Sequence, residues 1–402
     1  MKKIKRIIRL ALPAVLLLLW ISAAGETAEK VTYACSFTSS SRERDENFLT
    51  NLVDGNLGTY FTIRNKKEEA YLEIRSEEPV FGVYVMLSDR ERKDRYELMA
   101  EDGSGGWKKI GESRYLTNWH PLEEAQTALR IRAADGGKLR IAEIVLYGEG
   151  EKPEEVQDWQ EGGKADLMLL ACHPDDEVLW FAGVMPVYAE KGWRVQLAMM
   201  TSPNGERQLE LLNSAWHCGM RNYPCFIGLE DRNGQKKMDR QYALWEGEDR
   251  VHRLVTECFR KYRPEVVVTH GEKGEYGHSG HQVTADSAKK CIGYAADSGK
   301  YPESAEKYGA WQVKKLYLHQ YEENQVTMDW GQPLDSFGGK TGFDIAGEAF
   351  QCHRSQVKIG HYTFQQGGKY DNTAFGLYFS AVGEDSGKND FMENIRQSSP
   401  DD

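Results

Sequence analysis

The residues best suited to chemistry lie in the segment 172–177, Cys-His-Pro-Asp-Asp-Glu. This segment follows a largely apolar run at residues 166–171 and precedes a stretch with helical spacing. Side chains at such a strand-to-helix turn project from the carboxyl edge of a sheet, where open α/β folds place their sites. Because His173 and Asp176 are three residues apart, an imidazole nitrogen and a carboxylate oxygen can converge on one ion, while Asp175 points toward the substrate side.

A second group of candidate ligands follows another buried strand-like run, residues 265–269. It consists of His270 and the segment 274–281, Gly-Glu-Tyr-Gly-His-Ser-Gly-His. The three glycines suit a loop that folds tightly around a site. Two imidazoles and one carboxylate, with one position open for water, are a ligand set typical of catalytic zinc. The two groups together indicate a metal centre at one sheet edge.

The rest of the carboxyl-terminal half supplies elements that would hold these two groups together. Apolar strand-like runs alternate with segments of helical spacing, which is typical of a parallel sheet covered by helices. We expect strands at residues 166–171, 194–200, 223–228, 265–269 and 315–319, and helices at residues 177–191, 206–219 and 247–262. The sequence therefore predicts an α/β domain over residues 165–402.

The preceding part of the chain, residues 31–150, has a different pattern. Short segments of alternating apolar and polar residues are separated by Gly, Asp, Asn and Ser, as at residues 71–74, 80–87 and 139–147. A period of two with turn residues between the segments predicts an all-β sandwich. Residues 151–164, rich in Glu, Gln and Gly, are predicted to be a polar linker, and 402 residues leave room for two domains.

The first 24 residues have the composition of an export signal. Five basic residues precede an apolar run at residues 10–21, and Ser-Ala-Ala follows it. We expect residues 1–24 to be a signal peptide and the protein to be secreted, or membrane-anchored if the segment is not cleaved. The net charge of −11, with no basic block beyond the first ten residues, argues against a nucleic-acid partner.

Seven cysteines are scattered through the chain without a Cys-x-x-Cys pair. This spacing argues against a disulfide framework and predicts that most of the thiols are buried. Cys218 and Cys225 are the only pair close in sequence, so a bridge between them is a secondary hypothesis.

The two groups of candidate ligands together resemble the PIG-L/LmbE-like family of zinc-dependent N-deacetylases, over residues 165–385. Residues 173–177 match the family's His-Pro-Asp-Asp-Glu signature in full, and His278 and His281 match its distal His-x-x-His. The resemblance implies a Rossmann-like fold with a mostly parallel sheet. It also implies one Zn²⁺ ion bound by His173, Asp176 and His281, a general base at Asp175, electrostatic partners at His278 and Tyr276, and substrate binding by Arg207.

Two of these implied roles have alternatives. Arg207 begins an Arg-x-x-Glu pattern that is common on exposed helices, so a surface ion pair is the other interpretation of this residue. The family often has Pro-Asp between the two distal histidines, whereas this chain has Ser279 and Gly280. The acidic residue that would orient His278 is therefore missing, and how His278 is held and charged stays open.

The reaction that the resemblance implies is hydrolysis of an acetamido group. A bound metal lowers the pKa of its water toward about 7, and Asp175 would accept the proton of that water. Tyr276 and His278 would stabilise the negative charge that develops on the carbonyl oxygen. Proton delivery to the departing amine falls to Asp175 or to His278.

We therefore expect a secreted, metal-dependent hydrolase that removes acetyl groups from N-acetylglucosamine-type sugars or glycoconjugates. One alternative is a catalytically inactive glycan-binding or adhesion protein, against which the intact ligand set and Asp175 argue. Another is an amidase that acts on a non-sugar N-acyl compound with the same catalytic residues.

In the amino-terminal half, residues 51–61 and 141–148 resemble the discoidin (coagulation factor V/VIII type C) family of galactose-binding-like jelly rolls. The resemblance implies a jelly-roll sandwich with a carbohydrate partner, such as a cell-envelope glycan. The candidate residues, each with packing or a turn as the alternative, are Trp107, Trp119 and His120 for sugar and Asp54 and Asn56 for a structural Ca²⁺.

The remaining histidines have weaker assignments. His270 is close to the distal motif and is expected to support the ligands or the fold. Packing or surface roles are expected for His217, His252, His319, His353 and His361. Among these, the polar neighbours of His353 make it a candidate for the far wall of a pocket.

Overall fold

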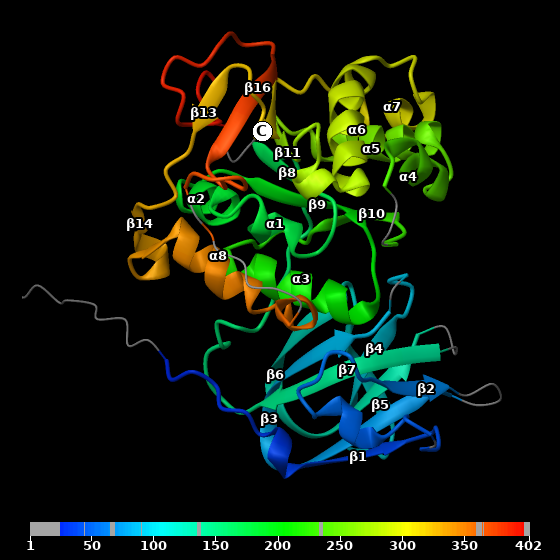
Figure 1. Ribbon diagram of the computed structural model, residues 1–402. Coiled ribbons are helices and arrows are strands. Elements are labelled where there is room, and N and C mark those ends of the chain that lie inside the picture. Colours follow the sequence, from blue (N-terminus) through cyan, green and yellow to red (C-terminus); the bar gives the residue numbers. More distant parts are fainter. Residues whose placement is uncertain are drawn as a thin grey trace, which may run out of the picture.

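The computed structural model describes residues 25–43, 45–64, 69–89, 91–134, 138–232, 236–358, 364 and 366–397. The predicted signal peptide and His361 lie outside these residues. Across the described ranges, no helix has the length and apolar character needed to span a bilayer. Figure 1 shows two parts of the chain packed against each other. The amino-terminal strands form one part, and a second sheet with its helices forms the other.

The amino-terminal sheet is built from antiparallel pairs in the order β2-β7-β3-β6-β4-β5, with β1 also paired to β3. Its strands are β1 (Cys35–Ser39), β2 (Phe61–Arg64), β3 (Tyr71–Leu87), β4 (Tyr96–Glu101), β5 (Trp107–Glu112), β6 (Thr117–Ala133) and β7 (Lys138–Tyr147), with short 3-10 turns η1 (Thr32–Ala34) and η2 (Leu49–Leu52). The prediction of an all-β region is confirmed.

Two long strands, β3 and β6, lie in the middle of this sheet. They pair with each other, but the register shifts after Arg75 and again after Val80. The first part of β3 pairs with β1, and its last part pairs with β7. One strand therefore contributes to two regions of the sandwich, and alternate residues such as Leu72 and Ile74 are buried, as the period of two predicted.

The second large sheet has the order β10-β9-β8-β11-β12-β16-β13. Its strands are β8 (Leu167–Ala171), β9 (Val195–Thr201), β10 (Cys225–Leu229), β11 (Val266–Thr269), β12 (Lys315–His319), β13 (Gln325–Thr327) and β16 (Ala374–Ser380), and a separate pair is formed by β14 (Pro333–Leu334) and β15 (Lys340–Thr341). The strands from β10 to β12 are parallel, whereas β16 pairs antiparallel with β12 and β13. The α/β prediction is confirmed, but the expectation of a mostly parallel sheet is not. The sheet is mixed because β16, which was not anticipated, runs antiparallel to β12 and β13.

Helices cover both faces of this sheet (Figure 1). They are α1 (Asp176–Leu179), α2 (Val184–Glu190), α3 (Gly205–His217), α4 (Met238–Leu244), α5 (Glu248–Tyr262), α6 (Ser279–Ala296), α7 (Pro302–Tyr308), α8 (Gly342–Phe350) and α9 (Arg354–Val357), with 3-10 turns η3 (Glu275–Gly277) and η4 (Asp335–Phe337). The predicted helix at residues 177–191 is divided into α1 and α2. The helix is interrupted at Ala182, whose φ of 32° is not helical. At the next residue the Trp330 ring packs against the backbone, and a Cβ at Gly183 would lie only 2.6 Å from it.

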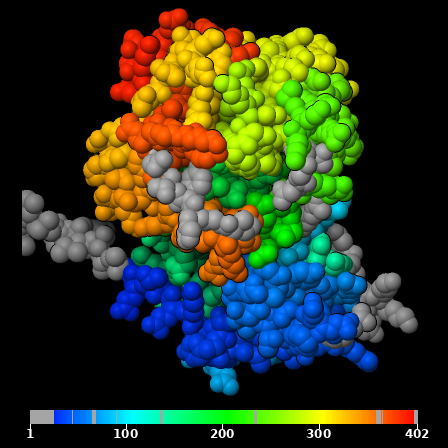
Figure 2. Space-filling model, in the orientation of Figure 1, coloured from blue at the N-terminus to red at the C-terminus, as the bar shows by residue number. Residues whose placement is uncertain are grey.

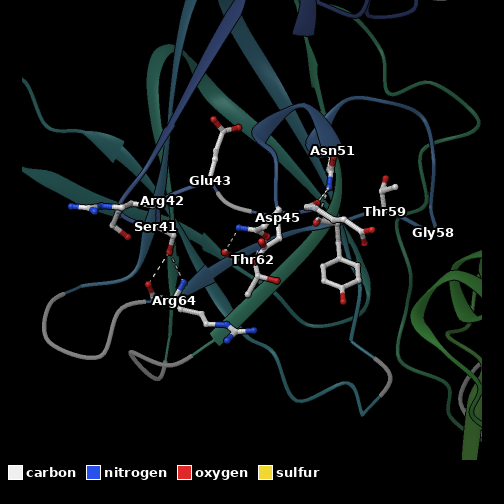
Figure 3. A pocket seen from close by; sticks show the side chains of 13 residues that line it. Ser41, Arg42, Glu43, Asp45, Asn51, Gly58, Thr59, Thr62 and Arg64 are labelled. Atoms are coloured by element: carbon white, nitrogen blue, oxygen red, sulfur yellow. Dashed lines mark hydrogen bonds between the residues drawn. The ribbon is translucent and has the colours of Figure 1, made fainter.

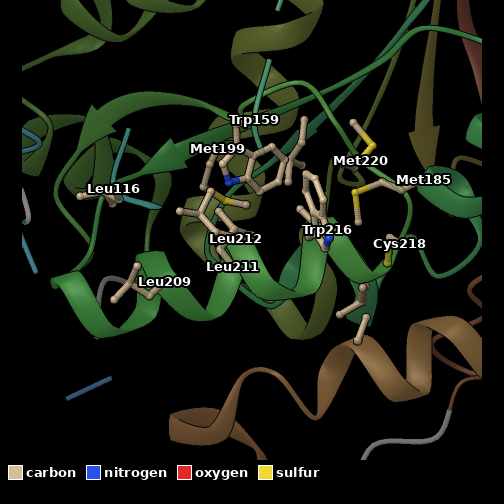
Figure 4. Close-up of a cluster of buried hydrophobic side chains, with 14 of the residues drawn as sticks. Leu116, Trp159, Met185, Met199, Leu209, Leu211, Leu212, Trp216, Cys218 and Met220 are labelled. Carbon is tan, nitrogen blue, oxygen red and sulfur yellow. The ribbon is translucent and has the colours of Figure 1, made fainter. Parts of the chain in front are cut away.

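The all-β and α/β parts share an apolar interface, which Figure 2 shows as a broad boundary and Figure 4 shows from inside. The Trp159 ring meets the Trp216 ring edge-on at 5.1 Å between centroids. Leu116 of the all-β part belongs to the same buried cluster as Leu209 of α3. Residues 151–164, predicted to be a polar linker, therefore contribute a buried tryptophan to the interface.

Candidate functional site

The two groups of candidate ligands meet at one edge of the second sheet. The strands β8 and β11 are parallel neighbours that end at Ala171 and Thr269. The segments that follow, residues 172–177 and 270–281, therefore leave the sheet side by side. Their ligand atoms lie within 4.8 Å of one another in three overlapping groups: His173 with His278 and His281, Asp176 with His270 and His281, and Cys172 with His173 and Asp176.

Asp176 belongs to two of these three groups. Its Oδ2 is 3.0 Å from His173 Nδ1 and 3.2 Å from His281 Nε2, and its Oδ1 accepts a hydrogen bond from Trp180 Nε1 at 2.8 Å. Burial alone would raise the pKa of Asp176, but the charge of His281 and a hydrogen bond from His173 hold it well below its usual range. The three predicted metal ligands thus form one buried cluster.

The surroundings of His281 favour a positive charge in this cluster. Its Nδ1 donates to Glu275 Oε2 at 2.7 Å, so the Nε2 of the neutral ring directs a lone pair toward Asp176. Within the described part of the chain, that buried Nε2 has no hydrogen-bond partner. Burial opposes a charge on His281, yet the carboxylates of Asp176 and Glu275 raise its pKa to about 10. A divalent cation meets the same requirement, and two imidazoles with one carboxylate suit Zn²⁺.

Glu275 holds three imidazoles around the ligands. Its Oε2 lies 2.7 Å from the Nδ1 atoms of His270 and His281, and its Oε1 lies 2.7 Å from His319 Nδ1. The backbone N–H of Cys172 donates to His270 Nε2 at 3.1 Å. A carboxylate behind a ligating imidazole fixes the orientation of the ring and increases its basicity. His270 therefore supports the ligands from behind, in agreement with the prediction for this residue.

Asp175 has a strained backbone. Its φ is 111°, a value that residues other than glycine rarely adopt. Its N–H donates to Glu177 Oε2 at 2.8 Å, while Glu177 Oε1 accepts from Ser214 Oγ and His353 Nε2, each at 2.7 Å. Burial and the charge of Asp176 raise the pKa of Asp175 well above its usual range. His353, a candidate for the pocket wall, lies instead behind Asp175 and is fully buried.

The backbone holds His278 in place of the acidic residue missing from the motif. His278 precedes α6, and its Nδ1 accepts a hydrogen bond from the Gly280 N–H at 3.2 Å. A Cβ at Gly280 would lie 2.9 Å from Cys172 Sγ and 3.1 Å from ring atoms of His173 and His278, so this position has no room for a side chain. Burial, with the neighbouring imidazoles, lowers the pKa of His278 to about 3. The ring is therefore neutral, with its proton on Nε2.

Arg207, in the first turn of α3, is directed into the site. Its NH2 donates to the carbonyl oxygen of Pro174 at 2.6 Å and lies 3.7 Å from Asp175 Oδ1, while its NH1 donates to Asp231. Glu210, the partner expected for a surface ion pair, instead accepts hydrogen bonds from Ser355. The helix-pairing interpretation of Arg207 is therefore wrong.

A pocket of about 360 Å³ opens beside the cluster. It is lined by His173, Asp175, Asp176, Leu179, Trp180, Arg207, Asp231, Tyr276, His278, Gln356 and Tyr370. Tyr276 is at its rim, with 60% of its surface exposed, whereas His281 lies fully buried beneath the lining. The structure thus brings all seven predicted site residues to one place.

Several residues around the pocket were missed by the sequence analysis. His319 ends β12, where it contacts Glu275, and Asp231 follows β10. Both therefore lie at the carboxyl ends of predicted strands, at the edge where the ligands lie. That position was a signal that could have identified them. Tyr370 comes from the irregular region after residue 350, where no periodic pattern predicts a location. Gln356, by contrast, is one of the polar neighbours of His353 that were expected at the far wall of a pocket, and it does line the pocket.

The candidate residues of the all-β part are engaged in internal contacts. Trp107 lies against the Arg130 guanidinium at 4.1 Å, Trp119 against the Tyr147 ring at 5.6 Å, and His120 against the Tyr96 hydroxyl at 2.7 Å. Asp54 accepts hydrogen bonds from the Asn56 N–H and the Thr59 hydroxyl, as expected of a turn. The structure thus agrees with packing roles for the aromatic residues and with a turn at Asp54 and Asn56.

Residues 168–292 match the protein-family model described as PIG-L, GlcNAc-PI de-N-acetylase. A relative from Catenulispora acidiphila, 1D-myo-inositol 2-acetamido-2-deoxy-alpha-D-glucopyranoside deacetylase 1, is 29% identical over 205 residues, which are 44% of this chain and 62% of that protein. The match thus spans less than two thirds of the relative. It confirms the resemblance seen in the sequence for residues 168–292.

Two solved structures are more distantly similar. The N,N'-diacetylchitobiose deacetylase from Pyrococcus horikoshii is 18% identical, with a TM-score of 0.38, and the match covers 48% of this chain and 71% of that one. The family 32 carbohydrate-binding module from Streptococcus pneumoniae EndoD is 14% identical, with a TM-score of 0.25, and the match covers 30% of this chain and 100% of that one.

Proposed function

We propose that this chain, whose residues 168–292 form a PIG-L family domain, is a metal-dependent N-deacetylase that acts on an N-acetylglucosamine-type sugar or glycoconjugate. The observation that carries the proposal is the buried cluster of His173, Asp176 and His281, with the Asp175 carboxylate beside it in one pocket. This arrangement supplies a cation site and a separate acid–base group at the same place.

His173, Asp176 and His281 would hold one Zn²⁺ ion. When bound, such an ion supplies a Lewis acid for the acetamido carbonyl and lowers the pKa of water. Glu275 orients His281 from behind, and Trp180 holds the second oxygen of Asp176. These contacts fix the ligand atoms before any ion arrives, which favours binding without rearrangement.

Asp175 is the general base in this proposal. Its carboxylate lines the pocket next to the ligands, and the hydrogen bond from its N–H to Glu177 fixes the backbone that carries it. Asp175 takes a proton from the attacking water and then delivers it to the departing amine. His278 is less suited to that delivery, because its Nδ1 already accepts from Gly280 and a second proton there would break this bond.

His278 and Tyr276 stabilise the developing oxyanion in this scheme. Both line the pocket, with their ring centroids 5.5 Å apart. The neutral His278 offers its Nε2–H and Tyr276 offers its hydroxyl as donors. Donors directed to where negative charge develops are worth more in a buried site than in water.

The pocket walls support a sugar substrate. Arg207, Asp231 and Gln356 provide donors and acceptors suited to hydroxyl groups, while Trp180 and Tyr370, with ring centroids 5.4 Å apart, provide an apolar side. A small number of polar groups facing aromatic surface is typical of sites that orient small ligands. A non-sugar N-acyl compound with few hydroxyl groups would make less use of these donors and acceptors.

The all-β part adds a candidate site for a longer glycan. A polar pocket of about 950 Å³ in this part is lined by residues that include Ser41, Arg42, Asn47, Tyr60 and Arg64. Figure 3 shows Ser41, Arg42 and Arg64 among the side chains around it. Tyr60 is partly exposed there and presents a ring on which a sugar can stack. We assign to this pocket the contact with a cell-envelope or environmental polysaccharide. It replaces Trp107, Trp119 and His120 as the candidate sugar site, because those residues are packed internally.

Export is part of the same proposal, and it rests on the composition of residues 1–24. The test is to express the full chain and a variant without residues 1–24, and to measure deacetylase protein in the medium, membrane and cell fractions. We expect the full chain outside the cytoplasm and the shortened chain inside it. Equal distribution of the two proteins would contradict export.

The activity test measures acetate release from N-acetylglucosamine, its oligomers and a non-sugar N-acyl amino acid, with metal content determined on the same sample. We expect about one Zn²⁺ per chain, acetate release from the sugars, and loss of activity with a chelator that added Zn²⁺ restores. Release from the N-acyl amino acid alone would favour the amidase. Glycan binding without acetate release would favour the inactive binding protein.

A further inference from the structure

Two cysteines that do not line the proposed active-site pocket face each other. All seven cysteines are thiols in the structure, and Cys225 Sγ lies 3.7 Å from Cys258 Sγ. The pairing of Cys218 with Cys225, suggested by their proximity in sequence, is wrong. Cys218 is fully buried in the core cluster shared with the all-β part, whereas Cys225 packs against the cluster on the other side of the sheet.

The surroundings of the pair allow the two sulfurs to approach further. A disulfide has an S–S distance of about 2.0 Å, so the sulfurs must move together by roughly 1.7 Å. Cys225 begins β10, which is the edge strand of the sheet, and the pairing of β10 with β9 is irregular between Phe226 and Leu229. Gly228 has a φ of 94° within that irregular stretch. Such an edge strand can shift locally while the central strands keep their register.

The chemistry of Cys225 favours oxidation. Its side chain is half-buried, and Tyr262, next to it, lines a surface pocket of about 320 Å³ together with Lys261. A hydrogen bond from Cys258 lowers the pKa of Cys225, and the nearby charge of Lys261 lowers it further. Thiolates are the nucleophiles of disulfide exchange, and their reactivity depends on such cationic, accessible surroundings.

We propose that Cys225 and Cys258 form a disulfide by exchange with a low-molecular-weight disulfide. The Cys225 thiolate attacks one sulfur of that oxidant, which forms a mixed disulfide and releases the first small thiol. Cys258 loses its proton, and its thiolate attacks the Cys225 sulfur and displaces the second small thiol. Two protein thiols are thereby oxidised and one external disulfide is reduced.

The bridge would restrain a segment that reaches the active-site pocket. It would close a loop of roughly 34 residues, and this loop contains Asp231, which accepts a hydrogen bond from Arg207. Constraining a loop of this length in the unfolded chain raises thermal stability by about 5 °C or more in a domain of this size. The restraint acts on β10 and α5 and leaves the ligand segments untouched.

The test uses the full chain, purified in reduced form and equilibrated with reduced and oxidised glutathione. Free thiols are then alkylated in denaturant, and the bridged peptides are identified by mass spectrometry. We expect two thiols to be lost, a peptide that joins Cys225 to Cys258, and a higher unfolding temperature that a reductant reverses. Cys225→Ser and Cys258→Ser should each abolish the bridge, while Cys35→Ser, at another half-buried thiol, should retain it.

Other outcomes of this experiment would overturn the proposal. Seven alkylated thiols after incubation with oxidised glutathione would show that the pair does not oxidise. A stable glutathione adduct on Cys225 would show that Cys258 cannot reach it. A bridge that involves any other cysteine would assign the pairing elsewhere.

Discussion

The backbone N–H of Asp175 donates a hydrogen bond to the Glu177 carboxylate at 2.8 Å, while Asp175 itself has a φ of 111°. Glu177 also accepts hydrogen bonds from Ser214 and His353, and its side chain is fully buried. A strained residue persists only where its surroundings determine its conformation. The position of the proposed general base therefore depends on a glutamate that does not line the pocket.

Replacing Glu177 should damage catalysis from outside the pocket. Glu177→Gln has one acceptor oxygen in place of two and cannot satisfy three donors, which should cost about 1–3 kcal/mol of stability. We expect acetate release to fall at least tenfold, with the Zn²⁺ content unchanged and a lower unfolding temperature. Glu303→Gln, at an exposed position on α7, is the control and should match the wild type. Wild-type turnover in Glu177→Gln would mean that Asp175 is positioned by other contacts.

Asp175→Asn tests the base role directly. The amide keeps the size of the side chain and cannot accept the proton, so turnover should fall by roughly 10²–10⁴. Metal analysis should show the same Zn²⁺ content, because Asp175 is not one of the three proposed ligands. A variant that loses both metal and turnover would place Asp175 among the ligands instead.

Gly280→Ala should disturb the cluster by steric conflict. The added methyl would lie 2.9 Å from Cys172 Sγ and 3.1 Å from ring atoms of His173 and His278, and must displace at least one of them. We expect weaker Zn²⁺ binding and reduced acetate release. Gly293→Ala, on the same helix with nothing near its Cβ, should leave both unchanged and stabilise α6 by up to about 1 kcal/mol. Equal behaviour of the two variants would contradict the close approach at Gly280.

Glu275→Gln should weaken metal binding. In the wild type, three imidazoles share the two oxygens of the Glu275 carboxylate. A glutamine has only one acceptor oxygen, so the orientation of His281 is no longer fixed. Loss of such a supporting carboxylate typically lowers metal affinity 10–100-fold. Titration of Zn²⁺ against a chromophoric chelator measures this change, with the exposed Glu272→Gln as the control. Unchanged affinity would show that the hydrogen bond to His281 does not orient the ligand.

The all-β part should lose stability in mild acid through His120. Burial lowers the pKa of this residue to about 4, from about 6.5 in the unfolded chain. The unfolded state therefore binds more protons between these values, so this contribution is complete above pH 6.5 and declines as the pH falls toward 4. Protonation of His120 should lower the free energy of unfolding, measured with urea, by roughly 3 kcal/mol between pH 7.5 and pH 4. His120→Gln should remove this decrease in the free energy of unfolding at low pH. His217→Gln, at an exposed position, should keep it.

The strands that carry the site could be predicted because they are buried on both faces. Every residue of β8, β9 and β11 is buried, which produces the continuous apolar runs that the sequence analysis identified. The later strands β13 and β16 mix buried and exposed positions, and β13 has only three residues, so neither produces a clear pattern. The antiparallel edge of the sheet was therefore missed.

The site was predictable where its residues are close in sequence. The spacing of His173 and Asp176 predicted that their side chains converge, and they lie 3.0 Å apart. Glu275, by contrast, joins His270 and His281 to His319 on a different strand, and no spacing in the sequence relates these partners. The role of Gly280 depends on contacts with Cys172, more than one hundred residues earlier. Such contacts can be recognised only once the arrangement of the strands in three dimensions is known.

The interface around Trp159 has a practical consequence for anyone who produces this protein. Trp159, Leu116 and the apolar side of α3 belong to one continuous cluster, as in the contact between permanent subunits. A catalytic fragment begun at residue 165 would leave Trp216 without its tryptophan neighbour and expose Leu209 to water. Such a fragment should aggregate. The amino-terminal half therefore keeps the α/β part soluble, and an expressed protein should include both.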